Sequence, residues 1–140
     1  MEELIKDYLK QLKPKLCILS TVDIIGKPQS AVMAYAVQDD LKIILSTHDN
    51  TRKYMNIEKN PNVSLVFGWN FKDYNVQYEG VAELITDNSE IEEIYFFANP
   101  KLIQFKDQIG MAYIRVTPTW IRLTDFSVHP AKVQEKNFDS

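Results

Sequence analysis

Cysteine is nearly absent from this chain of 140 residues, which contains only Cys17. A single cysteine excludes a disulfide within the chain and any zinc site built from several cysteines. Histidine is also scarce: His48 and His129 stand far apart, with no cysteine or carboxylate at the spacing of a metal site. We therefore expect no bound metal. Cys17 lies in a short apolar segment, which favours an inert thiol in the core over a reactive nucleophile.

Positive charge is not in excess, because 16 lysines and arginines face 19 aspartates and glutamates and the net charge is −3. No basic stripe is therefore available to displace counterions from a nucleic acid. No apolar run approaches the roughly 20 residues that cross a bilayer, and the first residues lack the pattern of a signal peptide. We expect a cytoplasmic protein, folded as a single domain over residues 1–140, that binds neither nucleic acid nor membrane.

The alternation of apolar and polar residues predicts a chain made mostly of strands. Six strands are expected, at residues 16–23, 29–37, 41–47, 62–69, 74–86 and 111–124. Helical periodicity predicts helices at residues 2–12, 51–60 and 87–108, the last interrupted near Pro100. Six mainly antiparallel strands can close into a small barrel, which removes the exposed edges of a sheet. We therefore predict an α+β fold, mainly β, built on a six-stranded barrel.

Three features interrupt this regular pattern. Gly80 lies inside a strand and predicts a bulge or bend. Pro118 cannot donate a ladder hydrogen bond, so it must lie at a sheet edge or a bulge. The chain after Asp125 is polar, and we expect a loosely held tail from about residue 127.

Two adjacent cations, Arg52 and Lys53, open the helix expected at residues 51–60. The helix dipole is already positive at this end, so each cation there should cost about 0.3–1 kcal/mol. A bound anion would reverse that cost, and the hydroxyls of Thr47 and Thr51 could join the free amides in holding it. We interpret this segment as a phosphate site, although a solvated helix start whose cations face water is the open alternative. Neither a P-loop nor a GxGxxG turn is present.

Small side chains follow one face of the strand at residues 29–37. Val32, Ala34 and Ala36 would let a flat ring approach the strand backbone, or they pack beneath a helix. A second group of polar and amphipathic residues alternates along later strands and lines either a site or an exterior sheet face; it consists of Gln77, Glu79, Trp120 and Arg122. No proton-transfer pair can be assigned, so the catalytic residues are unknown and an enzyme of this kind would need a cofactor.

Four segments, in this order and spacing, resemble the pyridoxamine 5′-phosphate oxidase-like family of FMN-binding split barrels, particularly its short general-stress-protein-like members. They read STVDIIGKPQSAVMAYAV, LKIILSTHDNTRKYMNIEKNPNVSLVF, VQYEGVAELI and RVTPTWIRLTDF. The resemblance covers residues 16–125, nearly the whole chain. It implies an antiparallel split β-barrel with flanking helices, FMN as the cofactor, and a homodimer with FMN at the subunit interface.

The resemblance also implies which residues bind the cofactor. In the family, an Arg/Lys pair holds the FMN phosphate with hydroxyl partners, and the matching residues are Arg52, Lys53, Thr47 and Thr51. Two neighbouring strands run along the flavin ring, and the matching residues are Ala31, Val32, Met33, Ala34, Leu45 and Ser46. Gln77 matches a glutamine that reaches the cofactor from the second subunit. Trp120, with Arg122 beside it, matches residues near the flavin on the last strand.

One departure from the family affects the implied substrate. The pyridoxamine 5′-phosphate oxidase itself has an Arg-Leu-His-Asp-Arg run that engages its substrate, where this chain has RLTDF from Arg122. The histidine and the second arginine are missing, so the implied function is an FMN-dependent oxidoreductase of an unidentified small molecule. The alternatives are a non-catalytic flavin-binding, stress or sensor protein, a deazaflavin-dependent reductase, or a barrel without ligand. Haem is disfavoured, because the two histidines have no axial arrangement.

Overall fold

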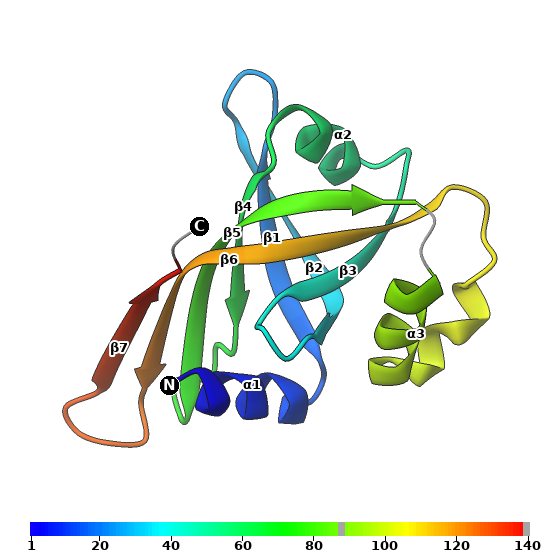
Figure 1. The fold of residues 1–140 in the computed structure, drawn as a ribbon. Coiled ribbons are helices and arrows are strands. Elements are labelled where there is room, and N and C mark those ends of the chain that lie inside the picture. The colour runs from blue at the N-terminus through cyan, green and yellow to red at the C-terminus, as the bar shows by residue number, and fades with distance from the viewer. Residues whose placement is uncertain (87–88, 139–140) are drawn as a thin grey trace.

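The computed structural model describes residues 1–86 and 89–138, and its centre is an antiparallel β-barrel (Figure 1). The strands are β1 (Leu16–Val22), β2 (Pro28–Val37), β3 (Ile43–His48), β4 (Asn62–Phe67), β5 (Tyr74–Ile85), β6 (Met111–Asp125) and β7 (Lys132–Asn137). The helices are α1 (Glu2–Gln11), α2 (Arg52–Lys59), α3 (Ser89–Ala98) and the 3-10 helix η1 (Pro100–Phe105).

Strand order closes the barrel. The sheet runs β3-β2-β1-β4-β5-β6-β7, and β3 also pairs with β6, so six strands form a closed ring with β7 outside it. The predicted six-stranded antiparallel α+β barrel is therefore confirmed. Of the helix expected at residues 87–108, Asp87 and Asn88 lie outside the described residues.

The barrel is split between β2 and β3. These strands pair only from Tyr35 to Val37, whereas β3 pairs with β6 along its whole length, Ile43–His48. The two strands therefore diverge, and residues 28–34 of β2 have no strand partner on the β3 side among the described residues. An unpaired stretch of strand edge leaves backbone groups available to a ligand.

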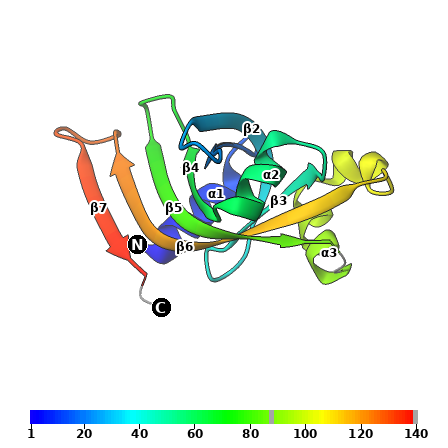
Figure 2. The same ribbon diagram turned by 90° about the horizontal axis from the view of Figure 1, so that it is seen from above.

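The expectation of a loosely held tail is wrong, because residues 132–137 form β7. This strand pairs with β6 from Trp120 to Asp125 and is the outermost strand in Figure 2. The physical reason lies in the length of β6. It pairs with β3 only from Met111 to Val116, so the rest of β6 extends past the closed barrel. The exposed edge of this extension is covered by the polar chain that follows it.

Gly80 and Pro118 face each other at a bulge, as the sequence predicts. The register of β5 against β6 shifts between Glu79 and Gly80, and Pro118 is the partner of Gly80. A β-carbon at Gly80 would lie 2.5 Å from the carbonyl oxygen of Thr117, so only glycine fits there. Pro118 also lies between the parts of β6 that pair with β3 and with β7, at a bulge where a residue without an N–H is tolerated.

Aromatic residues form the centre of the barrel. Phe67 is fully buried between Tyr35 and Tyr78, with ring centroids 4.9 and 6.1 Å away in edge-on geometry. Each buried phenol has a hydrogen-bond acceptor: the Tyr35 hydroxyl donates to the carbonyl of Leu9 (2.6 Å) and the Tyr78 hydroxyl to that of Leu41 (2.8 Å). Edge-on aromatic contacts and satisfied hydroxyls stabilise such a core beyond the burial of area.

Helices cover the barrel on three sides. In Figure 1, α1 lies across one end of the barrel and α2 across the other, while α3 packs outside β2 and β3. α3 contacts the barrel through a second apolar cluster, in which Tyr95 and Phe96 lie near Ala36 and Ile44. Cys17 is buried in the main core, and this burial raises the pKa of its thiol to about 12. The thiolate is therefore absent at neutral pH, as expected for an inert core residue.

Candidate functional site

The start of α2 is fixed by two threonine hydroxyls. Thr51 is the N-cap: its Oγ1 accepts from the backbone N–H of Tyr54 (3.3 Å) and donates to the carbonyl of His48 (2.9 Å). Thr47 Oγ1 lies 2.9 Å from Thr51 Oγ1. Thr47 Oγ1 also lies 3.4 Å from the carbonyl oxygen of His48, so the two hydroxyls share this acceptor and contact each other. Either hydroxyl can donate to a ligand only by giving up one of these bonds.

The donors left over at this helix end belong to Arg52 and Lys53. Their backbone N–H groups have no hydrogen-bond partner within the described part of the chain, and neither side chain forms an ion pair there. Two free amides at the positive end of a helix form a site for an anion. The first turn contains no acidic residue to neutralise this charge.

A cavity of about 120 Å³ opens beside this helix start, on the edge of the split. It is lined by polar groups of three elements, together with two apolar residues: Leu19, Thr21, Gln29, Ser30, Ala31, Arg52 and Lys53. Since one water molecule takes about 30 Å³ in the liquid, the cavity has room for a tetrahedral anion. Its lining carries two cations and no carboxylate.

Asn56 holds α2 in place above this cavity. It is buried, and its Nδ2 donates to Thr21 Oγ1 on β1 and to Gln29 Oε1 on β2, both at 2.9 Å. One side chain thus connects the helix to two strands. Residues four apart lie on the same face of a helix, so Asn56 lies on the face of Arg52.

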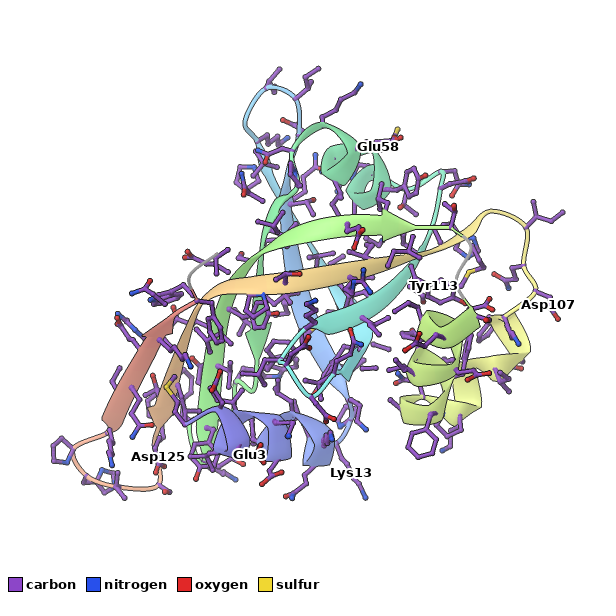
Figure 3. The ribbon with its side chains drawn as sticks, viewed as in Figure 1. Glu3, Lys13, Glu58, Asp107, Tyr113 and Asp125 are labelled. Atoms are coloured by element: carbon purple, nitrogen blue, oxygen red, sulfur yellow. The ribbon has the colours of Figure 1, made fainter. Side chains whose placement is uncertain are left out.

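Replacing Asn56 with alanine is expected to lower the free energy of unfolding by about 1–3 kcal/mol, because the buried Thr21 hydroxyl and the half-buried Gln29 side chain lose their donor. Chemical denaturation measures this loss. The matched control is Glu58→Ala on the exposed surface of the same helix (Figure 3), which should change stability by less than about 0.5 kcal/mol. Equal stability of the Asn56→Ala variant and the wild type would contradict the role of Asn56 as a tether.

The four predicted ring-contact residues on β2 point in different directions. Ala31 lines the cavity, and Val32 is 63% exposed on the outer face. Met33 points into the core, so only its backbone can face an external ligand. Ala34 is half-buried beside the α3 cluster. The split thus exposes the edge of β2 to a ligand, while its side chains alternate between core and outside.

The two predicted residues on β3 are directed away from the α2 cavity. Leu45 is fully buried in the core. The Ser46 hydroxyl donates to the hydroxyl of Tyr95 on α3 at 3.0 Å. Burial raises the pKa of Tyr95, so that phenol stays protonated. Any contact of Ser46 with a ligand at the split therefore needs its backbone or a rearranged side chain.

Gln77 and Trp120 lie on the outer sheet face, apart from the cavity. A row of directly paired residues runs across that face from Val32 through Ile18 and Val66 to Gln77 and Arg122. Three strand spacings separate Val32 from Gln77, a distance of about 14 Å. Within one chain, the structure therefore does not bring Gln77 to the phosphate end of the candidate site.

Arg122 has a partner in its own chain. Its Nε donates to Glu135 of β7 at 2.7 Å, and its guanidinium lies 5.4 Å from the centre of the Trp120 ring. A carboxylate and an aromatic face together fix the orientation of an arginine.

Sequence reasoning missed Thr21, Ser30 and Asn56 as residues around the cavity. The available signal was the spacing of Arg52 and Asn56, which places an amide on the cationic face of the helix. Thr21 and Ser30 gave no signal, because a hydroxyl on a strand is common and only the tertiary packing of α2 brings the helix to them.

No helix among the described residues is long and apolar enough to cross a membrane, and those residues contain no group of three or more possible metal ligands. A family model described as Pyridoxamine 5′-phosphate oxidase matches residues 1–125. The chain belongs to this family.

A pyridoxine/pyridoxamine 5′-phosphate oxidase of Yersinia pestis bv. Antiqua (strain Angola) is 26% identical to this family member over 139 residues. The alignment covers 95% of this chain but 63% of that relative, so the chain spans less than two thirds of its length.

Two solved structures share the fold. General Stress Protein 26 from Bacillus anthracis str. Sterne has a TM-score of 0.73 and 24% identity, covering 87% of this chain and 92% of that one. A pyridoxamine 5′-phosphate oxidase-related, FMN binding protein from Nostoc punctiforme has a TM-score of 0.69 and 10% identity, covering 99% and 96%. At these identities the likeness shows the fold alone.

Proposed function

We propose that this chain is an FMN-binding flavoprotein and an oxidoreductase of a small molecule. The observation that carries the proposal is the start of α2, where two free amides, two unpaired cations and a cavity without carboxylates lie together. This donor set fits a phosphate monoester, which is an anion with several acceptor oxygens. Membership of the oxidase family and the FMN-binding Nostoc neighbour support the choice of FMN.

The split supports a place for the rest of the cofactor. From Ala31, which lines the cavity, to Ala34, at the end of the unpaired stretch, the strand β2 rises by about 10 Å. A ribityl chain separates the phosphate of FMN from its ring by a comparable distance. The unpaired edge of β2 offers backbone hydrogen bonds along this path, and its small side chains leave room for a flat ring.

The outer sheet face supports assembly as a homodimer. Val32, Ile18 and Val66 form a short apolar row beside Gln77, and Val32 is largely exposed in one chain. A second copy packed on this face would remove that row from water. It would also bring Gln77 of the partner subunit towards the flavin on β2, a distance that one chain does not span.

Bound FMN would supply reversible two-electron chemistry, which no side chain here provides. The chain's own residues would bind the phosphate, orient the ring and exclude water through the partner's surface. No histidine or carboxylate lines the cavity among the described residues, so the residues there supply positive charge and hydrogen bonds.

The visible absorption spectrum of the purified protein tests the proposal. We expect a flavin spectrum, as purified or after addition of FMN, and mass spectrometry of the compound released on heating should identify FMN or a deazaflavin. A colourless protein whose melting temperature does not move with FMN would refute the proposal. Turnover with NADH or NADPH then separates an oxidoreductase from a flavin-binding sensor, which would show the spectrum without consuming nucleotide.

A further inference from the structure

A groove with lysines along its rim lies between the end of α1, strand β2 and the α3–η1 segment. Two adjoining cavities of about 590 and 390 Å³ form it, and Lys10, Lys15 and Ala98 line both. Small-molecule sites in proteins usually measure about 300–1,000 Å³. We call this feature the lysine groove.

The inner surface of the lysine groove is apolar. Ala36, Val37 and Ile94 lie along one part of it, and Ala34 and Leu16 along the other. Phe97 stands at its edge with 91% of its side chain exposed. A phenylalanine exposed to this degree beside an apolar hollow gains burial when an apolar ligand fills the hollow.

The rim of the groove is positive on a chain whose net charge is negative. Lys10, Lys13, Lys15 and Lys101 line the two cavities, and Glu93 is the acidic residue among their lining residues. Lys10 lies 3.5 Å from Asp39, but Lys13, Lys15 and Lys101 form no ion pair within residues 1–86 and 89–138. Figure 3 shows Lys13 at the end of α1 nearest to α3.

The walls of the groove are held by internal bonds. Asn99 Nδ2 donates to the carbonyls of Tyr35 and Tyr95, both at 3.0 Å, and so ties the end of α3 to β2. The groove therefore exists before any ligand enters, which lowers the entropy cost of binding.

We propose that the lysine groove binds the substrate, and that this substrate is a small apolar molecule with one anionic group. The apolar floor takes its hydrocarbon or aromatic part, and the unpaired lysines on the rim attract its carboxylate, sulfonate or phosphate. The assignment as substrate rests on the proposed function, because Ala34 and Ala36 both line the groove and lie on the strand proposed to carry the flavin ring.

Two fluorescent probes that differ by one charge test this proposal on the full-length protein. Anilinonaphthalene sulfonate carries a sulfonate, and N-phenylnaphthylamine is the same molecule without it. In the Lys15→Glu/Lys101→Glu variant we expect the anionic probe to bind about tenfold more weakly, and the neutral probe to bind as to wild type. Phe97→Ala should weaken both probes, because it removes apolar surface. The matched control is Lys59→Glu/Lys72→Glu, two exposed lysines away from the groove, which should leave both affinities unchanged.

Two results would overturn the proposal. One is equal binding of the anionic probe to wild type and to Lys15→Glu/Lys101→Glu. The other is a wild-type dimer that binds neither probe while the charge-reversed variant sediments as a monomer, since the groove would then be covered by a second copy. The FMN proposal fails separately, because replacement of Arg52 and Lys53 should change FMN affinity and leave probe affinity as it is.

Discussion

Replacing both Arg52 and Lys53 with alanine should weaken FMN binding by about a hundredfold or more. Each charge-assisted hydrogen bond contributes about 1.5–3 kcal/mol, and the exposure of Arg52 places the expected loss towards the lower end of their sum. Fluorescence quenching of FMN during titration measures the dissociation constant directly.

The stability of the same variant separates lost binding from lost folding. Cations in the first turn oppose the helix dipole, so their removal should stabilise ligand-free α2 by about 0.3–1 kcal/mol each. The melting temperature without FMN should therefore stay equal or rise, while the shift on adding FMN shrinks. Lys59→Ala, at the other end of the helix, is the matched control for charge. An unchanged FMN affinity in the double variant would remove the phosphate assignment.

Replacing Phe67 with alanine should lower the free energy of unfolding by about 3–5 kcal/mol. This side chain is fully buried between Tyr35 and Tyr78, and its removal leaves a cavity between two rings that are fixed by hydrogen bonds to Leu9 and Leu41. The fixed rings cannot collapse into the space without losing those bonds. Urea denaturation measures the change.

A second substitution at the same position makes this test specific. Phe67→Leu keeps most of the volume and should cost less than about 1.5 kcal/mol. A loss below about 1 kcal/mol for Phe67→Ala would mean that the core repacks, and the aromatic stack would then not be the rigid centre of the barrel.

Much of the barrel could be predicted because strand periodicity is a local signal. Alternating side chains and short apolar runs rich in β-formers gave all six barrel strands, and Gly80 with Pro118 gave the bulge. β7 was missed, because KVQEKN has no apolar face and its pairing depends on how far β6 extends past the barrel. A polar segment forms a strand only where another strand leaves a free edge for it to pair with. The sequence of the polar segment itself does not reveal that edge.

The candidate site was readable where its chemistry is local. Two adjacent cations at a helix start predict an anion site from a short stretch of sequence alone. In the structure the backbone amides of these two residues are free to bind an anion. Thr21 and Gln29 face each other in the β1–β2 hairpin, but Asn56 reaches them only through the tertiary packing of α2, so this contact could not be read from the sequence. The direction of Ser46 was also beyond the sequence, because β3 is buried on both faces and alternation carries no information there.

The seventh strand limits how copies of this protein can assemble. β7 is the edge strand of the sheet, next to β6. A strand from a second molecule would have to pair with β7, whose six residues include two lysines and a glutamate. Charged edge strands oppose the growth of a sheet from one molecule into the next. A dimer of the kind proposed above would then form through the faces of the barrel, and a surface between two faces can enclose a ligand that a continuous sheet would leave exposed.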